Sequence, residues 1–277
     1  MAEATTRFMN IQGEDLAIHV YEPLAYGFAG VGGDGGAVLG EAFLIHGFTG
    51  SKEDFLDLGP ELAARGYRVA TMDNRGMHES ANSQRADAYT TKSIAEDARL
   101  VAEGLGMDRP HLLGHSFGGL VAQNAVIDSP EAWRSLTLFC SGPGALPDVG
   151  QLPQMHAWLS ATDMATLWDD ARDAEARGRL RYDMRKTRWQ ASDKNALLGH
   201  ANHLMHDEHH TAGVAATGIP VHVVFGENDD AWPLDVQRQM AAELNAPVTV
   251  IADAGHCPNE DQPAATAEVL AGFWAKN

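Results

Sequence analysis

Short apolar segments rich in valine, isoleucine and leucine alternate along the chain with longer segments whose apolar residues recur at helical spacing. This alternation is typical of a largely parallel sheet with helices on both faces. The predicted strands are residues 16–23, 42–48, 68–73, 111–116, 135–142, 221–229 and 248–256. The predicted helices beside them are residues 51–66, 93–106, 117–130 and 266–276. The pattern therefore indicates an α/β fold with a mostly parallel, doubly wound sheet.

Two segments interrupt this alternation. Residues 26–36 contain six glycines between two predicted strands, which indicates a flexible surface loop. Residues 146–217 show several helical patterns and no convincing strand, so we expect an all-helical cap inserted before the next-to-last strand. The predicted division is a core of residues 1–145 and 218–277 and a cap of residues 146–217, which would lie over the carboxyl edge of the sheet.

The segment LLGHSFGG (112–119) reads Gly-x-Ser-x-Gly between a predicted strand and a predicted helix. A nucleophile on a sharp strand-to-helix turn has strained backbone angles, and the positions two residues to either side lack room for a side chain. Such a turn raises the Ser116 hydroxyl above the sheet and directs backbone N–H groups and the helix dipole to the same point. Ser116 is therefore the predicted nucleophile.

A serine hydroxyl needs a base, and the base needs an acid that orients it. Asp229 and Asp230 follow the next-to-last predicted strand, and His256 follows the last one. Because the carboxyl ends of parallel strands meet at one edge of a sheet, these side chains can converge with Ser116. The order Ser, Asp, His predicts a catalytic triad whose acid is Asp229 or Asp230.

These motifs resemble those of the α/β-hydrolase superfamily, specifically its cap-bearing, serine esterase or lipase-like branch. The resemblance runs from about residue 42 to the C-terminus and is weakest across the cap. It is carried by four segments: HGF (46–48), DNRGMHES (73–80), GHSFGG (114–119) and GENDDAWP (226–233). They are similar to the family's oxyanion loop, the loop after the next strand, the nucleophile elbow and the acid turn.

The resemblance implies a role for particular residues. In the acid turn the family's aspartate stands three residues after a glycine and four before a proline, which selects Asp229 here and leaves Asp230 as the alternative. The backbone N–H groups of Phe48 and Phe117 would form the oxyanion hole, aimed at charge that develops in the transition state. No cofactor is implied.

One position departs from the family's pattern. Where the loop after the second parallel strand has its second glycine, this chain has His78. If the loop needs a glycine backbone angle there, it has been rebuilt. His78 is then either a surface residue in an altered turn or a side chain that projects towards the site entrance.

The cap holds a run of histidines, HANHLMHDEHH, over residues 200–210. The run lacks the H-E-x-x-H arrangement of a zinc helix, and successive three-residue steps turn around a helix. We therefore predict no metal site and a polar or pocket-facing surface, with ligation by helix neighbours such as His203 and His206 as the alternative.

The six arginines of residues 172–188 are expected to form surface pairs, with contact to an anionic substrate as the alternative. The residues expected to line the substrate pocket are His46, His115, Met155, Trp158, Trp168, His203, His206 and Trp232.

The composition of the chain limits the kinds of partner that it is expected to bind. The formal net charge of −18 would repel a phosphate backbone and anionic membrane surfaces, so we expect a small-molecule substrate and neither nucleic acid nor membrane. The chain shows no signal-peptide pattern and no apolar run of membrane-spanning length. Its two cysteines, Cys140 and Cys257, are expected to be free thiols. A cytoplasmic location is the expectation.

Three functional hypotheses follow. The first is a cofactor-independent serine hydrolase that cleaves an ester, lactone or thioester of a small, largely apolar molecule through an acyl-enzyme. The second keeps the same site for C–C bond hydrolysis, elimination or perhydrolysis, which the resemblance allows. The third is a non-catalytic binding protein on the hydrolase fold. The presence of all three triad residues favours an enzyme.

Overall fold

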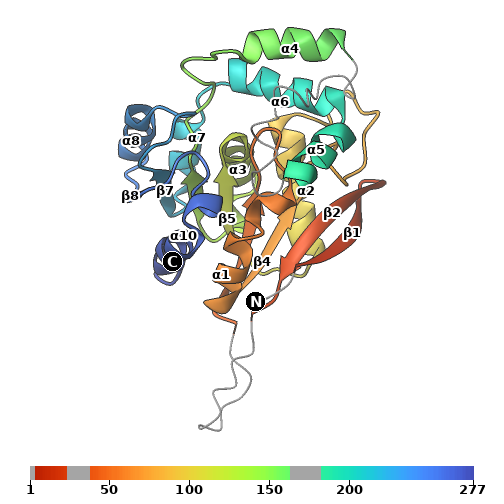
Figure 1. The fold of residues 1–277 in the computed structure, drawn as a ribbon. Helices are drawn as coiled ribbons and strands as arrows, with labels where there is room; N and C mark the ends of the chain where they lie inside the picture. The colour runs from red at the N-terminus through yellow and green to blue at the C-terminus, as the bar shows by residue number, and fades with distance from the viewer. Residues whose placement is uncertain (1–3, 24–37, 163–181) are drawn as a thin grey trace.

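The computed structural model of the chain describes residues 4–23, 38–162 and 182–277. At its centre lies a sheet of eight strands in the order β1-β2-β4-β3-β5-β6-β7-β8 (Figure 1). From β4 to β8 along this order neighbouring strands are parallel, whereas β1 and β2 form an antiparallel extension at one edge. The strands are β1 (Thr5–Ile11), β2 (Glu14–Tyr21), β3 (Gly40–Ile45), β4 (Tyr67–Met72), β5 (His111–His115), β6 (Leu136–Phe139), β7 (Val221–Gly226) and β8 (Val248–Ile251). The predicted mostly parallel sheet is confirmed.

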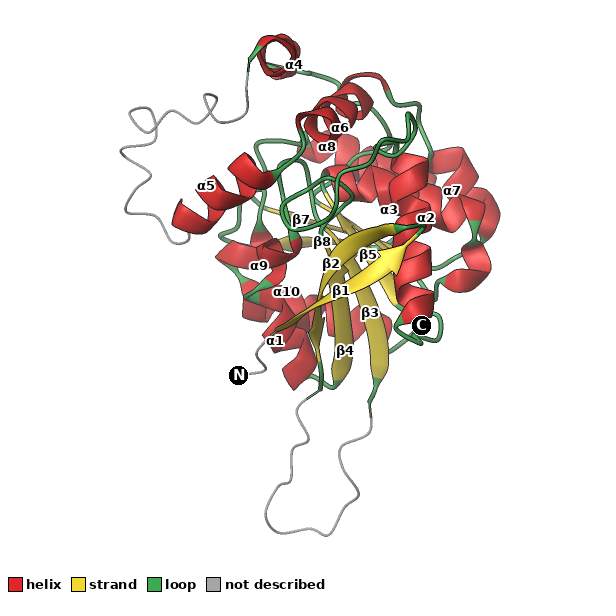
Figure 2. Cartoon of the chain, turned by 90° about the vertical axis from the view of Figure 1, so that its right-hand side faces the viewer, coloured by secondary structure: helices red, strands yellow, loops and turns green. Residues whose placement is uncertain are grey.

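Helices cover both faces of this sheet (Figure 2). Beside the strands lie η1 (Lys52–Phe55), α1 (Leu58–Ala64), α2 (Thr91–Gly104), α3 (Phe117–Asp128), η2 (Pro130–Ala132), α8 (Leu234–Glu243), α9 (Pro258–Asp261) and α10 (Pro263–Trp274). No helix in the described part of the chain combines the length and the apolar character that crossing a bilayer requires.

The side chains of the strands divide the core into two layers, because successive residues of a strand point to opposite faces. In β3, Phe43 and Ile45 pack into a cluster with residues of α2, α3 and α8. Ala42 and Leu44, between them, pack into a second cluster with residues of α1 and α10. Both faces of the central strands are therefore buried, which explains why these strands read as continuous apolar runs.

Between β6 and β7 the described residues form the helices α4 (Leu152–Ala161), α5 (Tyr182–Ala191), α6 (Lys194–His206) and α7 (Thr211–Thr217). Figures 1 and 2 both show α4, α5 and α6 beyond one end of the sheet. This helical insertion precedes the next-to-last strand, as the sequence predicts. The last of its helices, α7, packs against α3 and α8 beside the sheet.

Several elements differ from the prediction, among them the short helices η2 and α9, which the pattern does not predict. The pattern does not predict β1, which forms a hairpin with β2 through a tight turn at Gln12 and Gly13, both at positive φ. It also does not predict α8. The predicted helix 51–66 is divided into η1 and α1. The predicted glycine loop 26–36 lies outside the described residues.

Candidate active site

Ser116 occupies a sharp turn between β5 and α3, with φ 54° and ψ −119°. Residues other than glycine rarely adopt this backbone conformation, so the surrounding structure must hold it. The Ser116 N–H donates to the carbonyl of Phe139 at 2.9 Å, and the Ser141 hydroxyl donates to the Ser116 carbonyl at 2.7 Å. These bonds fix the serine at the carboxyl end of β5.

The glycines around Ser116 are required by close backbone contacts. A Cβ atom on Gly114 would overlap the carbonyl oxygen of Gly118, and a Cβ atom on Gly118 would overlap the carbonyl oxygen of Ile45. Both obstacles are backbone atoms of neighbouring elements, which cannot turn aside as a side chain can. The glycine spacing therefore reflects how closely α3 approaches β3 and β5.

His256 and Asp229 form a hydrogen-bonded pair beyond the ends of β8 and β7. His256 Nδ1 lies 2.8 Å from Asp229 Oδ1. The same oxygen accepts from the N–H groups of Ala231 and Trp232, and Oδ2 accepts from the side-chain amide of Gln237 at 2.9 Å. Burial alone would raise the pKa of Asp229, but the bonds from His256, Trp232 and Gln237 hold it below its ordinary value. The exposed neighbour Asp230 does not make this bond.

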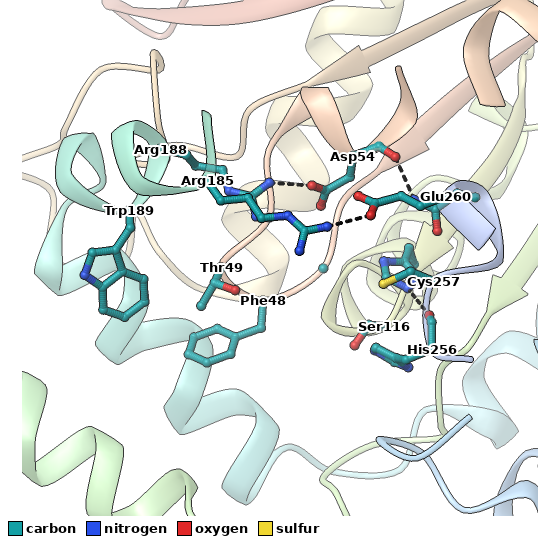
Figure 3. A pocket seen from close by; sticks show the side chains of 14 residues that line it. Phe48, Thr49, Asp54, Ser116, Arg185, Arg188, Trp189, His256, Cys257 and Glu260 are labelled. Carbon is teal, nitrogen blue, oxygen red and sulfur yellow. Dashed lines mark hydrogen bonds and ion pairs between the residues drawn. The ribbon is translucent and has the colours of Figure 1, made fainter. Parts of the chain in front are cut away.

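Ser116 and His256 line the same pocket, which has a volume of about 380 Å³ (Figure 3). Phe48 and Thr49, from the loop after β3, and Cys257, beside His256, line it as well. Phe117, the other predicted oxyanion donor, is fully buried and begins α3 directly after Ser116. The pocket thus brings together the predicted nucleophile, the predicted base and one of the two predicted oxyanion residues.

Helix α5 forms the opposite wall through Arg185, Arg188 and Trp189. Figure 3 shows the two arginines reaching from this helix towards acidic residues of the core. Arg188 pairs with Asp54 and donates to the Ser51 hydroxyl at 3.2 Å, and Arg185 lies 2.6 Å from Glu260. The sequence predicts surface pairs for these arginines, but Arg185 and Arg188 pair instead with carboxylates of the core, and these pairs line the pocket. Arg188 and Trp189 follow Arg185 by three and four residues, a spacing that places all three side chains on one face of a helix. This spacing was the signal in the sequence that could have located the pocket wall.

The other predicted pocket residues are distributed between the pocket, the core and the cap surface. His115 lines the pocket. His46 is buried beneath the loop after β3, where it accepts from the Asn74 N–H at 3.0 Å, and Trp232 is buried beside Gly142. The remaining described ones lie on α4 and α6 and are not among the residues that line this pocket; they are Met155, Trp158, His203 and His206. Trp168 lies outside the described residues.

Most of the contacts that the histidines of residues 200–210 make stabilise the C-terminal end of α6. Asp207 lies 3.5 Å from His203 and 3.3 Å from His210, and these two histidines help to hold the pKa of Asp207 below its usual range although burial opposes them. His200, in contrast, is fully buried and stacks on Phe117 with ring centroids 4.3 Å apart. The histidines of residues 200–210 therefore stabilise the C-terminal end of α6 and pack this helix against the core.

His78 takes the backbone conformation that a glycine would provide, with φ 48°. The chain therefore keeps a left-handed backbone angle at this position. The His78 ring is mostly buried, 3.7 Å from the Glu53 carboxylate, and does not line the pocket. A strained histidine thus replaces the glycine of the family's pattern.

Two groups of side chains in the described residues have the composition of a metal site. The first contains Glu53, His78 and Glu79. Its two carboxylates already bind the Lys52 ammonium, which lies 2.6 Å from each, so a cation occupies their centre. The second contains His115, Cys140 and His256. Cys140 and Cys257 are free thiols, as predicted.

Known proteins resemble this chain in sequence and in fold. Residues 42–269 match the family described as "Alpha/beta hydrolase family". A proline iminopeptidase of Lactobacillus delbrueckii subsp. bulgaricus is 29% identical over 180 residues, which cover 61% of this chain and 58% of that protein. The matched region thus spans less than two thirds of that relative's length.

Two solved structures show the same fold. A hydrolase from Pseudomonas aeruginosa PA01 aligns with a TM-score of 0.77 at 22% identity, covering 98% of both chains. A mutant of the N-acyl homoserine lactonase AidH, complexed with N-hexanoyl homoserine, aligns with a TM-score of 0.76 at 20% identity. That alignment covers 99% of this chain and 97% of the lactonase. At these identities the two structures support the fold alone.

Proposed function

The chain belongs to the alpha/beta hydrolase family, and from this premise we propose that it is a serine hydrolase acting through an acyl-enzyme on a carboxylic ester, lactone or thioester of a small molecule. One observation carries the proposal: Ser116 on its strained turn shares a pocket with His256, whose ring is bonded to the buried Asp229. A hydroxyl, a base and an orienting acid are the parts that nucleophilic acyl transfer requires.

In this proposal the proton moves between Ser116 and His256. His256 Nδ1–H donates a hydrogen bond to Asp229, which leaves Nε2 as the base. As the Ser116 oxygen attacks the carbonyl carbon, Nε2 takes the hydroxyl proton and then returns it to the departing alcohol or thiol. A water molecule repeats the sequence on the acyl-enzyme, and the acid is released. The N–H groups of Phe48 and Phe117 are the proposed donors to the oxyanion.

The lining and the volume of the pocket also indicate which kind of substrate it accepts. Phe48 and Trp189 offer apolar surface, while two arginines and two carboxylates form a paired, electrically balanced rim. A volume of about 380 Å³ lies at the small end of ligand pockets. We therefore expect short acyl groups to be preferred over long ones.

The test is hydrolysis of p-nitrophenyl esters and lactones of increasing chain length. Ser116→Ala should lower kcat by about 10⁴-fold or more, with an unchanged melting temperature. Ser160→Ala, on the exposed face of α4, is the matched control and should keep the wild-type rate. Equal turnover by wild type and Ser116→Ala would contradict the proposal. If no ester or lactone is cleaved although Ser116 reacts with a covalent probe, C–C bond hydrolysis, elimination or perhydrolysis becomes the better assignment.

A further inference from the structure

The thiol of Cys140 lies next to the proposed catalytic base. Cys140 directly follows β6, between the strands that carry Ser116 and Asp229. One ring nitrogen of His115, one of His256 and the Cys140 sulfur all lie within 4.8 Å of one another. His115 and Cys140 are buried, whereas the His256 side chain is 22% exposed at the pocket. The proposed reaction uses neither His115 nor Cys140.

The two buried members differ in their hydrogen bonds, and the Cys140 thiol donates to the side chain of Asp229. His115 Nε2 lies 2.8 Å from the His256 carbonyl oxygen, which can only accept, so the ring proton lies on Nε2. Its Nδ1 is buried with no hydrogen-bond partner in the described structure. One hydrogen bond and ring packing against Phe139 and His256 hold the ring of His115 in place.

The arrangement matches the preferences of zinc. Two imidazoles and one thiolate are ligands that Zn²⁺ and similar soft or borderline ions select over Mg²⁺ or Ca²⁺. Tetrahedral zinc with Zn–N near 2.0 Å and Zn–S near 2.3 Å places its ligand atoms roughly 3.5 Å apart. Side-chain movements of about 1 Å would therefore close this cluster around an ion. Asp229, bonded to His256, or water from the pocket can supply the fourth ligand.

We propose that His115, Cys140 and His256 form an inhibitory binding site for Zn²⁺ and chemically similar ions. On binding, the metal replaces the thiol proton of Cys140, which is released to solvent, and no redox change occurs. Coordination through His256 Nε2 removes the base from Ser116, and coordination through Nδ1 breaks the bond to Asp229. Either mode stops turnover, so the inhibitory consequence rests on the proposed function, whereas metal binding itself does not.

Binding is measured first, without substrate. Titration of the wild-type protein with Cd²⁺ should produce a thiolate-to-metal charge-transfer absorption that saturates at one ion per chain. Cys140→Ala and Cys140→Ser should abolish this band, and Cys257→Ala, the matched thiol control, should keep it. A band that persists in both Cys140 variants, or its absence from the wild type, overturns the site. This experiment remains decisive even if no substrate is found.

Inhibition is measured next, with each variant compared with its own metal-free rate. The Zn²⁺ concentration for half-inhibition of ester hydrolysis should rise at least tenfold in Cys140→Ala and stay at the wild-type value in Cys257→Ala. Mg²⁺ should leave all the rates unchanged. Equal sensitivity of wild type and Cys140→Ala would assign the inhibition to other histidines and overturn the proposal.

Discussion

His256 Nδ1 and Asp229 Oδ1 lie 2.8 Å apart although 27 positions separate the two residues in the chain. The Asp229 side chain is completely buried, and both of its oxygens accept further hydrogen bonds from its own turn and from Gln237. This carboxylate is therefore fixed before any substrate binds. It determines which nitrogen of His256 carries the proton and which one faces the reaction.

Replacing Asp229 with asparagine tests that role. The amide of Asp229→Asn can donate to Nδ1 and so favours the wrong tautomer of His256, and kcat should fall by about 10⁴-fold while the protein stays folded. The exposed neighbour supplies the control, because Asp230→Asn removes the same charge one residue away and should leave kcat within about twofold. Comparable losses in the two variants, measured by steady-state kinetics, would mean that Asp229 does not orient the base.

The glycines of the nucleophile turn should be irreplaceable. Gly114→Ala places a Cβ against the Gly118 carbonyl, and we expect a loss of about 3 kcal/mol or more in the free energy of unfolding. Gly272 in α10 has open space around its Cα, so Gly272→Ala should instead stabilise the protein by about 0.5–1 kcal/mol. Urea denaturation compares the two, and a Gly114→Ala variant as stable as wild type would contradict the close packing of the elbow.

Buried histidines should make the fold acid-labile. Burial lowers the pKa of four histidines from 6.5 to about 4; they are His46, His111, His115 and His222. Between these values the unfolded chain binds the proton and the folded chain does not, so stability falls as the pH falls through this window. Burial raises the pKa of Asp73 to about 7, so in this window the folded chain binds a proton at Asp73 that the unfolded chain does not bind. This one proton opposes the effect of the histidines. The net slope should exceed about 1 kcal/mol per pH unit.

Urea unfolding at pH 7, 6 and 5 measures that slope. His222→Gln should make the dependence shallower, because it removes one titrating ring while an amide can still reach the Thr249 hydroxyl, which lies 2.9 Å from His222 Nε2. Stability that stays level or rises towards pH 5 would refute the account of neutral buried histidines.

The two ion pairs between α5 and the core should differ in strength. Arg188 and Asp54 are nearly buried, with side chains 11% and 13% exposed, whereas Arg185 is 40% exposed beside Glu260. Double-mutant cycles to alanine should therefore give a coupling of about 1–3 kcal/mol for Arg188–Asp54 and below about 1 kcal/mol for Arg185–Glu260. A reversed order would mean that α5 is attached to the core by other contacts.

The central strands of the sheet could be predicted because they are buried on both faces and bounded by turn residues. The edge strand β1 could not, because Phe8 is 59% exposed and the strand has no apolar run that marks it. Its pairing follows instead from the two-residue turn at Gln12 and Gly13. Edge strands depend on their hairpin more than on burial, so the hydrophobic pattern does not predict them.

The predicted site residues differ in how far sequence can locate them. Ser116, Asp229 and His256 stand at strand ends, where the fold itself brings them to one edge. The cap residues have no such constraint, because the face that α5 or α6 presents depends on tertiary packing. Trp158 on α4 is therefore exposed, while Trp189 on α5 lines the pocket, although both are tryptophans in helical patterns of the same insertion.

The central claim is that Ser116 is the nucleophile of an acyl-transfer site, and covalent labelling tests it most directly. A fluorophosphonate should modify the wild-type chain once, with the adduct mapped by peptide mass spectrometry to Ser116. Labelling should slow strongly in Asp229→Asn and vanish in Ser116→Ala. An adduct on another residue, or unchanged labelling of the Ser116→Ala variant, would contradict the assignment of Ser116.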